Sequence, residues 1–398
     1  MDERRMIQSF KNQLNRISEL EFYKKRFNEY GINPQSINSL EDFQKIPFMD
    51  LSDLTDAFLE TPPLGTLCHP KTQRVNLSPG PKGFLPILFT NLDIQNMGKV
   101  NADSFRAAGI TSDDIVAITF GYHLFIAGLS FQGGFEALGC KTIPVGPGDA
   151  NRTVDIINRF GVTVLVSNPS FALRCAEEGA KGIRILLAGG EPFSSVEGFK
   201  DRVRAAYGQI GLIDSYGLAQ VSPLARECSK ETGLHILDEW VYVEIIDPET
   251  GKVIPDGQRG EVVVTNLMKE SSPLLRFRTG DLSILVHEKC SCGREATLPN
   301  GVIGSISEMH KIKGVKIYPS QMGPILKGFP ELSGNYRFIV SSSGATDYLE
   351  ILVEGDALDD FDLSTLKARV KQVFLISPNK ISIQKDIGDG PPILDKRY

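Results

Sequence analysis

Between residues 115 and 190 the sequence alternates regularly between two patterns. Short runs rich in β-branched and other apolar residues, typical of buried strands, are separated by segments with the apolar spacing of helices. The predicted strands are 115–120, 141–145, 162–166 and 183–187, and the predicted helices are 126–138, 151–160 and 170–179. This alternation predicts an α/β fold with a largely parallel sheet. Ligands of such sheets bind beyond the carboxyl ends of the strands, where Gly-rich turns occur here.

The flanking regions have different patterns. Residues 3–30 carry apolar groups at helical spacing and predict an N-terminal helix. From about residue 235, short strands separated by turn residues predict a β subdomain, and after Gly314 a second alternation predicts a small α+β domain. We therefore predict a large domain over residues 1–303 with its β subdomain at about 228–300, a hinge at 304–308, and a small mobile domain over 309–398.

Composition and charge exclude several classes of protein. The chain has 398 residues, enough for two domains, and its net charge of −6 argues against general nucleic-acid binding, which favours a basic surface. No apolar run approaches the roughly 18 residues of a membrane span, and the charged N-terminus begins an amphipathic helix instead of a signal peptide. Six cysteines in a chain this long do not indicate a disulfide framework. We expect a cytoplasmic protein without a nucleic-acid or membrane partner.

A loop with the sequence Ser-Pro-Gly-Pro-Lys-Gly spans residues 78–83, between two predicted strands. A loop of Ser, Gly and Lys residues between strands could hold phosphate groups through its backbone N–H groups. Its two prolines remove two of those donors. A tight structural turn is an equally good interpretation.

Seven motifs occur in an order and spacing that resemble one family. They are 120–125 (FGYHLF), 189–192 (GGEP), 215–218 (SYGL), 233–236 (GLHI), 244–248 (EIIDP), 276–281 (RFRTGD) and 311–320 (KIKGVKIYPS). Together they are similar to the phenylacetate–coenzyme A ligase branch of the adenylate-forming, AMP-binding superfamily, and the resemblance covers nearly the whole chain. Members of that branch join a carboxylate to ATP; the small domain then swings, and coenzyme A displaces AMP from the acyl-adenylate.

The resemblance implies a nucleotide site and an acyl pocket. It places Asp281 on the ribose hydroxyls. Tyr216, Gly217 and Glu191 would lie near the adenine. Arg278 would lie near the nucleotide, but a role in a structural ion pair is an equally good interpretation of this residue. The acyl pocket would be lined by Phe120, Tyr122, Phe125, Gly189 and Gly190. Two phenylalanines and two glycines suit a flat aromatic or a slim acyl group.

Several departures from the family's pattern affect the adenylation step. The loop at 78–83 lacks the threonines of the family's phosphate loop, and Gln220 stands where the family has an acid that helps to hold magnesium. A neutral Gln is a much poorer ligand for a hard cation than a carboxylate. In the hinge, Ser305 and Ser307 stand in place of an arginine and of the pivot aspartate.

The adenylating lysine near the C-terminus is also missing from its expected position. Aligning the end of the chain on the family places Leu394 there, with Lys385 and Lys396 nearby as candidate substitutes. Losing one transition-state donor typically costs roughly 100–1000-fold in rate, so several losses would leave little adenylation. We predict an enzyme with impaired or non-standard adenylation, in which the use of ATP and magnesium stays open.

His123 stands at the mouth of the acyl pocket implied by the resemblance, where the family usually has glycine. It could act as a general base on a hydroxyl, amine or thiol nucleophile; the alternative is a hydrogen-bonded wall residue. We predict a biosynthetic enzyme handling an aryl or acyl carboxylate, which could take its acyl group from a thioester of coenzyme A or of an acyl carrier protein. The alternative is a catalytically inactive scaffold protein that binds an acyl group or a nucleotide.

Four further residues suggest a metal site. Cys228 and His235 are followed by Cys290 and Cys292, which gives Cys-x6-His and Cys-x-Cys. Some ligases of this branch look similar and carry a structural zinc on the same set. Three Cys and one His form a standard closed tetrahedral zinc site, which would brace the fold and leave no position for chemistry. The alternative is a group of reduced, partly buried thiols.

Overall fold

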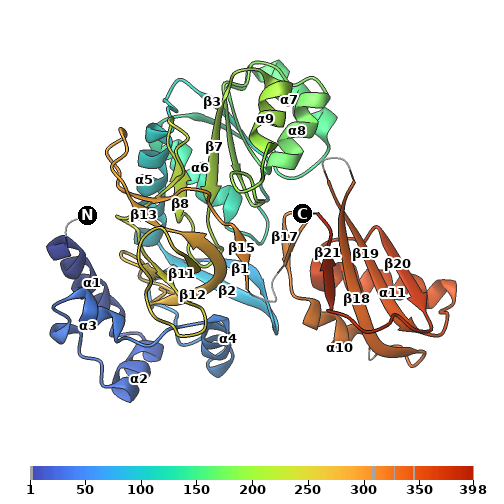
Figure 1. The fold of residues 1–398 in the computed structure, drawn as a ribbon, viewed down its shortest axis with the longest axis horizontal. Coiled ribbons are helices and arrows are strands. Elements are labelled where there is room, and N and C mark those ends of the chain that lie inside the picture. The colour runs from blue at the N-terminus through green and yellow to red at the C-terminus, as the bar shows by residue number, and fades with distance from the viewer. Residues whose placement is uncertain (1–2, 307–309, 327, 344–345, 398) are drawn as a thin grey trace. The chain divides into compact units, whose positions relative to one another are not determined.

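The computed structural model describes residues 3–306, 310–326, 328–343 and 346–397 (Figure 1). The chain forms two compact units. The first comprises residues 1–78 with 85–306, and the second comprises residues 79–84 with 307–398. In the predicted hinge, Gly304 and Ser305 form strand β15 of the first unit, whereas Ser307 and Glu308 lie outside the described residues. The role of this segment as a hinge stays a prediction.

The first unit is organised around a nine-stranded sheet with the order β13-β14-β9-β8-β7-β6-β5-β3-β4. Five neighbouring strands run parallel: β4 (Lys141–Pro144), β3 (Ile115–Ile118), β5 (Val164–Ser167), β6 (Ile185–Gly189) and β7 (Gly211–Tyr216). Four short strands extend it in antiparallel fashion: β8 (Ala225–Glu227), β9 (Leu234–Ile236), β14 (Ala296–Leu298) and β13 (Val286–His287). The predicted α/β fold is confirmed; the antiparallel extension was not predicted.

Helices cover both faces of the parallel strands. On one face lie α5 (Asn91–Ala107) and α6 (Ala127–Leu138), and on the other lie α7 (Ala150–Phe160), α8 (Pro169–Glu177) and α9 (Phe199–Tyr207) (Figure 1). Alternate residues point to opposite faces of a strand, so Leu187 and Ile213 pack with the first group while Leu186 and Leu212 pack with the second. Among the described residues, no helix has the length and apolar character needed to cross a membrane.

The N-terminal segment forms two helices where the sequence pattern predicted one. α1 (Glu3–Ile17) and α2 (Glu21–Tyr30) are separated at residues 18–20. Leu20 has an extended backbone conformation (φ −70°, ψ 136°) and its side chain is buried in the core, so tertiary packing overrides the local helical pattern here. The next helix, α3 (Leu40–Gln44), is capped by Ser39, whose side chain accepts the backbone N–H of Asp42. A further helix, α4, spans Leu51–Glu60.

The predicted phosphate loop is part of a β-hairpin. β1 (Thr72–Gly80) and β2 (Gly83–Thr90) leave only Pro81 and Lys82 between them, so Ser78, Pro79 and Gly80 are strand residues. The turn therefore has just two residues, one of them a proline without an N–H group.

A second sheet of the first unit carries the RFRTGD motif. Its order is β10-β11-β12-β15, with β10 at Val241–Ile246, β11 at Arg259–Asn266 and β12 at Phe277–Ile284. Met49 binds alongside β12: its N–H donates to the carbonyl of Arg276 (3.0 Å), and the N–H of Arg278 donates to the Met49 carbonyl (2.8 Å). The motif strand is thus fastened to the N-terminal segment.

The second unit is a small α+β domain, as predicted. It contains a hairpin of β16 (His310–Ile312) and β17 (Val315–Ile317), the short helix α10 (Met322–Leu326), and a sheet with the order β20-β19-β18-β21. The strands of this sheet are β18 (Leu332–Ser343), β19 (Thr346–Gly355), β20 (Lys380–Gln384) and β21 (Ile393–Asp395). Helix α11 (Asp360–Phe374) packs on the sheet through Leu366 and Val370, which meet Phe338 and Ile351 in one apolar core.

Candidate active site and metal cluster

Three of the predicted acyl-pocket residues lie together at the carboxyl end of the parallel strands. Phe120 follows β3, and its ring stacks on Phe131 of α6 with the ring centroids 5.3 Å apart. Gly189 ends β6 beside it, and Gly190 follows in the turn. A Cβ atom on Gly190 would lie 3.3 Å from the Phe120 ring and 2.7 Å from Nδ2 of Asn168, and the φ of +82° at Gly190 also favours glycine.

The other two predicted pocket residues lie in the loop between β3 and α6. Tyr122 is half-buried; its buried hydroxyl has no hydrogen-bond partner among the residues that the structure describes, and burial raises its pKa. The ring of Phe125 lies 5.8 Å from that of His123. His123 itself is exposed and lies against Gly121, and within the described ranges no residue forms a hydrogen bond with its ring nitrogens. The interpretation as a hydrogen-bonded wall residue therefore has no support in the geometry.

Two of the predicted nucleotide residues are brought into direct contact. The hydroxyl of Tyr216, at the end of β7, donates to Oδ2 of Asp281 on β12 (2.7 Å), and both side chains are buried. Burial, reinforced by the negative charge of Asp281, raises the pKa of Tyr216 well above its ordinary value. In the part of the chain that the structure describes, no residue donates to Oδ1 of Asp281, which leaves one carboxylate oxygen able to accept from a ligand hydroxyl. Gly217 follows directly, close to Ser222.

Arg278 has the ion pair that the sequence left as one of two interpretations. Its Nε donates to Oε2 of the buried Glu261 (2.8 Å), and the other carboxylate oxygen of Glu261 accepts the N–H of Gly280 (3.1 Å). Arg276 forms a similar pair with the buried Glu244, at 3.0 and 3.1 Å, although its own φ of +48° is unfavourable for a side chain. Both arginines hold the motif strand in place.

Glu191 is engaged by the protein as well. Its carboxylate accepts both the backbone N–H (3.2 Å) and the hydroxyl (2.9 Å) of Ser170 in the first turn of α8. A carboxylate at a helix N-terminus is favourable because unpaired N–H groups and the helix dipole meet it there. The sequence pattern gave no sign of this contact, because Ser170 follows strand β5 and Glu191 follows strand β6, so only the folded sheet brings them together.

Gln220 is buried, with 5% of its surface exposed, and it lies next to a buried cation that the sequence analysis missed. The ammonium group of Lys269 donates to the backbone carbonyl of Gln220 and to Oγ of Ser272, each at 3.3 Å, and lies 4.7 Å from the centre of the Phe89 ring. Burial lowers the pKa of Lys269 to about 8, which the more distant carboxylate of Asp93 partly opposes. A single Lys in a polar segment carries no sequence signal for such a position.

At the C-terminal end, the position expected for the adenylating lysine is held by a strand residue. Leu394 lies in β21 and pairs with Ile339 of β18 in parallel register. Lys385 and Lys396, the candidate substitutes, are both exposed.

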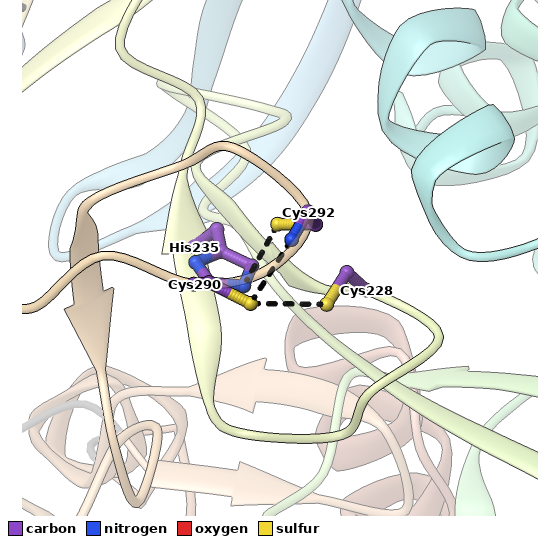
Figure 2. Close-up of side chains that lie close together, drawn as sticks. All are labelled: Cys228, His235, Cys290 and Cys292. Atoms are coloured by element: carbon purple, nitrogen blue, oxygen red, sulfur yellow. Dashed lines mark hydrogen bonds between the residues drawn. The ribbon is translucent and has the colours of Figure 1, made fainter.

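The four predicted metal ligands converge (Figure 2). Their donor atoms all lie within 4.8 Å of one another. The Sγ atoms of Cys228 and Cys290 are 3.9 Å apart, and Sγ of Cys292 is 3.5 Å from Nε2 of His235. Ligands placed about 2.3 Å from a tetrahedral zinc would be roughly 3.8 Å apart, so the donor set fits such an ion in both chemistry and spacing.

Pairing of strands holds this cluster in position. His235 in β9 lies opposite Thr297 in β14, and Oγ1 of Thr297 is 2.9 Å from Nδ1 of His235, which leaves Nε2 directed at the cysteines. The N–H groups of Lys230 and Cys292 point at the sulfurs of Cys228 (3.4 Å) and Cys290 (3.5 Å). The N–H of Cys292 lowers the pKa of Cys290 to about 7, whereas burial raises the pKa of Cys228 to about 11.

A last residue missed by the sequence analysis lies beside Phe131, whose ring stacks on Phe120. Arg226 on β8 is fully buried, and its guanidinium group lies over the rings of Phe105 and Phe131. Burial lowers its pKa to about 9, which still leaves the group charged at neutral pH.

Comparison with known proteins gives consistent matches. Residues 91–268 match the family described as AMP-binding enzyme, and residues 314–384 match the AMP-binding enzyme C-terminal domain. The phenylacetate-coenzyme A ligase of Thermus thermophilus is 34% identical over 347 residues, which is 84% of this chain and 76% of the relative. The corresponding ligase of Escherichia coli is 31% identical over 83% of this chain and 77% of its own length.

The fold is also similar to solved structures. A crystal structure of 2-hydroxyisobutyryl-CoA ligase in complex with 2-HIB-AMP and CoA matches 99% of this chain and 90% of its own, with a TM-score of 0.93 and 26% sequence identity. The similarity covers both units of the chain.

Proposed function

The chain belongs to the AMP-binding enzyme family, in its phenylacetate–coenzyme A ligase branch, and from this premise we propose an acid–thiol-ligase-type enzyme in which ATP-dependent adenylation is impaired. It handles an aryl or slim acyl group in the pocket beside Phe120 and Gly190. It takes that group from a preformed thioester of coenzyme A or of an acyl carrier protein and passes it to a small-molecule nucleophile. ATP and magnesium take little part in this reaction.

The observation that carries the proposal is the surroundings of Gln220. The family resemblance puts a magnesium-binding acid at this position, and here the side chain is neutral and buried. The positive charge already present there belongs to Lys269, which is 3.3 Å from the Gln220 carbonyl. A divalent cation at this point would meet an ammonium group and would lack the expected carboxylate, which disfavours its binding.

Two further features support the same conclusion. The hairpin at 78–83 has two prolines and only two turn residues, so it offers few N–H groups to a triphosphate. Leu394 cannot supply the positive charge that the family's lysine brings to the acyl-phosphate. The loss of N–H donors in the hairpin and the loss of the lysine's charge together weaken adenylation more than either loss alone would.

The transfer step that we propose needs no external energy source. A hydroxyl, amine or thiol attacks the thioester carbon while the exposed imidazole of His123 accepts its proton. The carbon–sulfur bond then breaks, and the same proton passes from His123 to the leaving thiolate. The products are the acylated acceptor and the free thiol of coenzyme A or of the carrier protein. Oδ1 of Asp281 and the hydroxyl of Tyr216 can still bind a ribose hydroxyl, for which the AMP-like part of coenzyme A is a candidate.

Two assays on the full chain test this proposal. Carboxylate-dependent pyrophosphate exchange with ATP, run over a panel of aromatic and short acids, should stay at the blank for the natural sequence. Acyl transfer from coenzyme A thioesters to hydroxyl, amine and thiol acceptors, followed by mass spectrometry, should be detectable. His123→Gln should lower transfer by about 100-fold or more, whereas His287→Gln, at another exposed histidine, should not. Clear pyrophosphate exchange would refute the proposed loss of adenylation, and folded protein inactive in both assays would favour the scaffold alternative.

We also propose that Cys228, His235, Cys290 and Cys292 hold one structural zinc ion. The donor set and its spacing support this, and Thr297 fixes the tautomer of His235 in the way that second-layer residues commonly do in zinc sites. Four protein ligands leave no open position on the ion, so it would brace β9 and β14 and take no part in the reaction.

A further inference from the structure

Behind the predicted acyl pocket lies a buried cation for which the residues that the structure describes supply no anion. The side chain of Arg226 is 2% exposed. Its Nε donates to Oγ of Ser215 at 3.1 Å, its Nη1 donates to Oγ of Ser104, and its guanidinium carbon lies 4.5 Å from the centre of the Phe105 ring. These partners are neutral, and they engage two of the five N–H groups that a guanidinium carries.

Other arginines in the interior of this protein are paired differently. Arg276 meets the buried carboxylate of Glu244 at 3.0 Å, and Arg26 meets Asp53 at 3.1 Å. For Arg226, no carboxylate within the described ranges lies at ion-pair distance, and the charged group that acts on it most, Arg294, is another cation. Burying a charge without a counter-ion is strongly unfavourable, so an uncompensated guanidinium beside the predicted acyl-pocket residues points to an anionic ligand.

The sheet register connects this cation to the acyl pocket. Gly189 on β6 is paired with Ser215 on β7, and Ser215 is paired with Arg226 on β8, so the three residues follow one another across the carboxyl end of the sheet. On the helix side, the Phe131 ring stacks on Phe120 and also lies 5.5 Å from the Arg226 guanidinium. Arg226 therefore lies two strands away from Gly189 at the same end of the sheet, beside the rings that adjoin the predicted pocket.

We propose that the acyl group bound here carries a second carboxylate, which pairs with Arg226. This inference rests on the acyl pocket of the proposed function and names its substrate class: a dicarboxylic acid or its monothioester, with a flat or slim spacer. A carboxylate can accept two parallel N–H bonds from a guanidinium, which is the strongest pairing open to either group. The rings of Phe120 and Phe131 would hold the spacer, and the Ser104 and Ser215 hydroxyls would keep the guanidinium in its plane.

Binding of free acids tests this without any turnover. Calorimetry and thermal shift on the full chain would compare succinate, glutarate, adipate and terephthalate with butyrate, valerate, hexanoate and 4-methylbenzoate, which lack the second charge. At least one dicarboxylate should bind about 10–100-fold more tightly than its monocarboxylate partner, the range expected for a hydrogen-bonded ion pair. Arg226→Met should remove this preference. Arg202→Met provides the control, because Arg202 also stacks on a phenylalanine but is exposed on α9.

The natural sequence decides the question even if Arg226→Met does not fold. Monocarboxylates binding as tightly as every matched dicarboxylate would overturn the assignment, as would a preference that persists in a folded Arg226→Met protein. The binding and transfer experiments together distinguish a failure of this inference from a failure of the proposed acyl-transfer reaction. An Arg226-dependent preference for dicarboxylates together with no acyl transfer would keep this inference and reject the transfer mechanism, whereas transfer of neutral acyl groups without the preference would do the reverse.

Discussion

The predicted ligand side chains of the metal cluster converge on one another, whereas those of the nucleotide region bond to other parts of the protein. In the cluster, four donor atoms converge within 4.8 Å of one another, and the outside side chains that contact them are hydroxyls: Oγ1 of Thr297 lies 2.9 Å from Nδ1 of His235, and Oγ1 of Thr232 lies 3.7 Å from Sγ of Cys290. In the nucleotide region, the predicted ligand residues bond mainly to the protein: Glu191 to Ser170, and Arg278 to Glu261. A residue type in the right motif is therefore weak support for a ligand contact when the fold gives it a partner of its own.

The largest expected effect concerns the metal cluster. Cys290→Ser should remove the bound zinc, of which we expect about one ion per chain from one Cys3His set. Because metal binding contributes about 10–16 kcal/mol to folding in zinc-finger peptides, the melting temperature should fall by ~10 °C or more. Metal analysis and thermal unfolding measure both results, with Cys68→Ser, outside the cluster, as the control. Two results would remove the contrast between the two regions. One is retention of zinc by Cys290→Ser, and the other is an absence of zinc from the natural sequence after preparation in the presence of zinc.

The next effect tests whether the arginines of the RFRTGD motif are structural. Arg276→Met leaves Glu244 buried and unpaired, and we expect a loss of about 3–5 kcal/mol in the free energy of unfolding. Urea unfolding would measure it. Arg106→Met, which breaks an exposed pair with Asp103, should cost at most ~0.5 kcal/mol. Similar losses in the two variants would mean that the motif arginine is not held as the structure indicates.

A smaller effect follows from the buried ammonium beside Gln220. Burial lowers the pKa of Lys269 to about 8, so between pH 8 and its unfolded value of about 10.4 the unfolded chain binds a proton that the folded chain does not. The titration of Lys269 should therefore make the free energy of unfolding rise with pH through this window. Below the window it should leave the free energy of unfolding unchanged. From pH 7.5 to 9.5 we expect the natural sequence to gain roughly 1–2 kcal/mol relative to Lys269→Met, measured by urea unfolding. Parallel pH profiles for the two proteins would contradict this.

The smallest expected effect concerns the contact between Tyr216 and Asp281. Tyr216→Phe removes one buried hydrogen bond and should lower the free energy of unfolding by ~1 kcal/mol. In the described ranges, no hydrogen bond involves the hydroxyl of Tyr242, so Tyr242→Phe should be close to neutral. If Tyr216→Phe unfolds at the same urea concentration as the natural sequence, the bond contributes nothing, and this part of the nucleotide region is less firmly held than the structure indicates.

The sequence predicted most of the fold because its strongest patterns are local. The β-branched run at 115–120 and the turn residues around Gly314 lie next to the residues whose structure they set, and the Cys and His spacing restricts which chemistry can follow. The break at Leu20 was missed because a distant core buries that residue. Arg226, Lys269 and the contact of Glu191 with Ser170 were missed for the same reason, since each depends on partners that only the sheet register brings together.

The placement of the cluster has a consequence for how the chain reaches its fold. Cys228 and Cys290 are 62 residues apart, and the segment between them contains β10, β11 and β12 with Asp281. Joining the ends of a flexible loop of that length costs roughly 4 kcal/mol of chain entropy. If the proposed zinc ion binds before the strands of the motif sheet pair, it closes this loop first, and the RFRTGD strand then finds its neighbours within a closed segment of the chain.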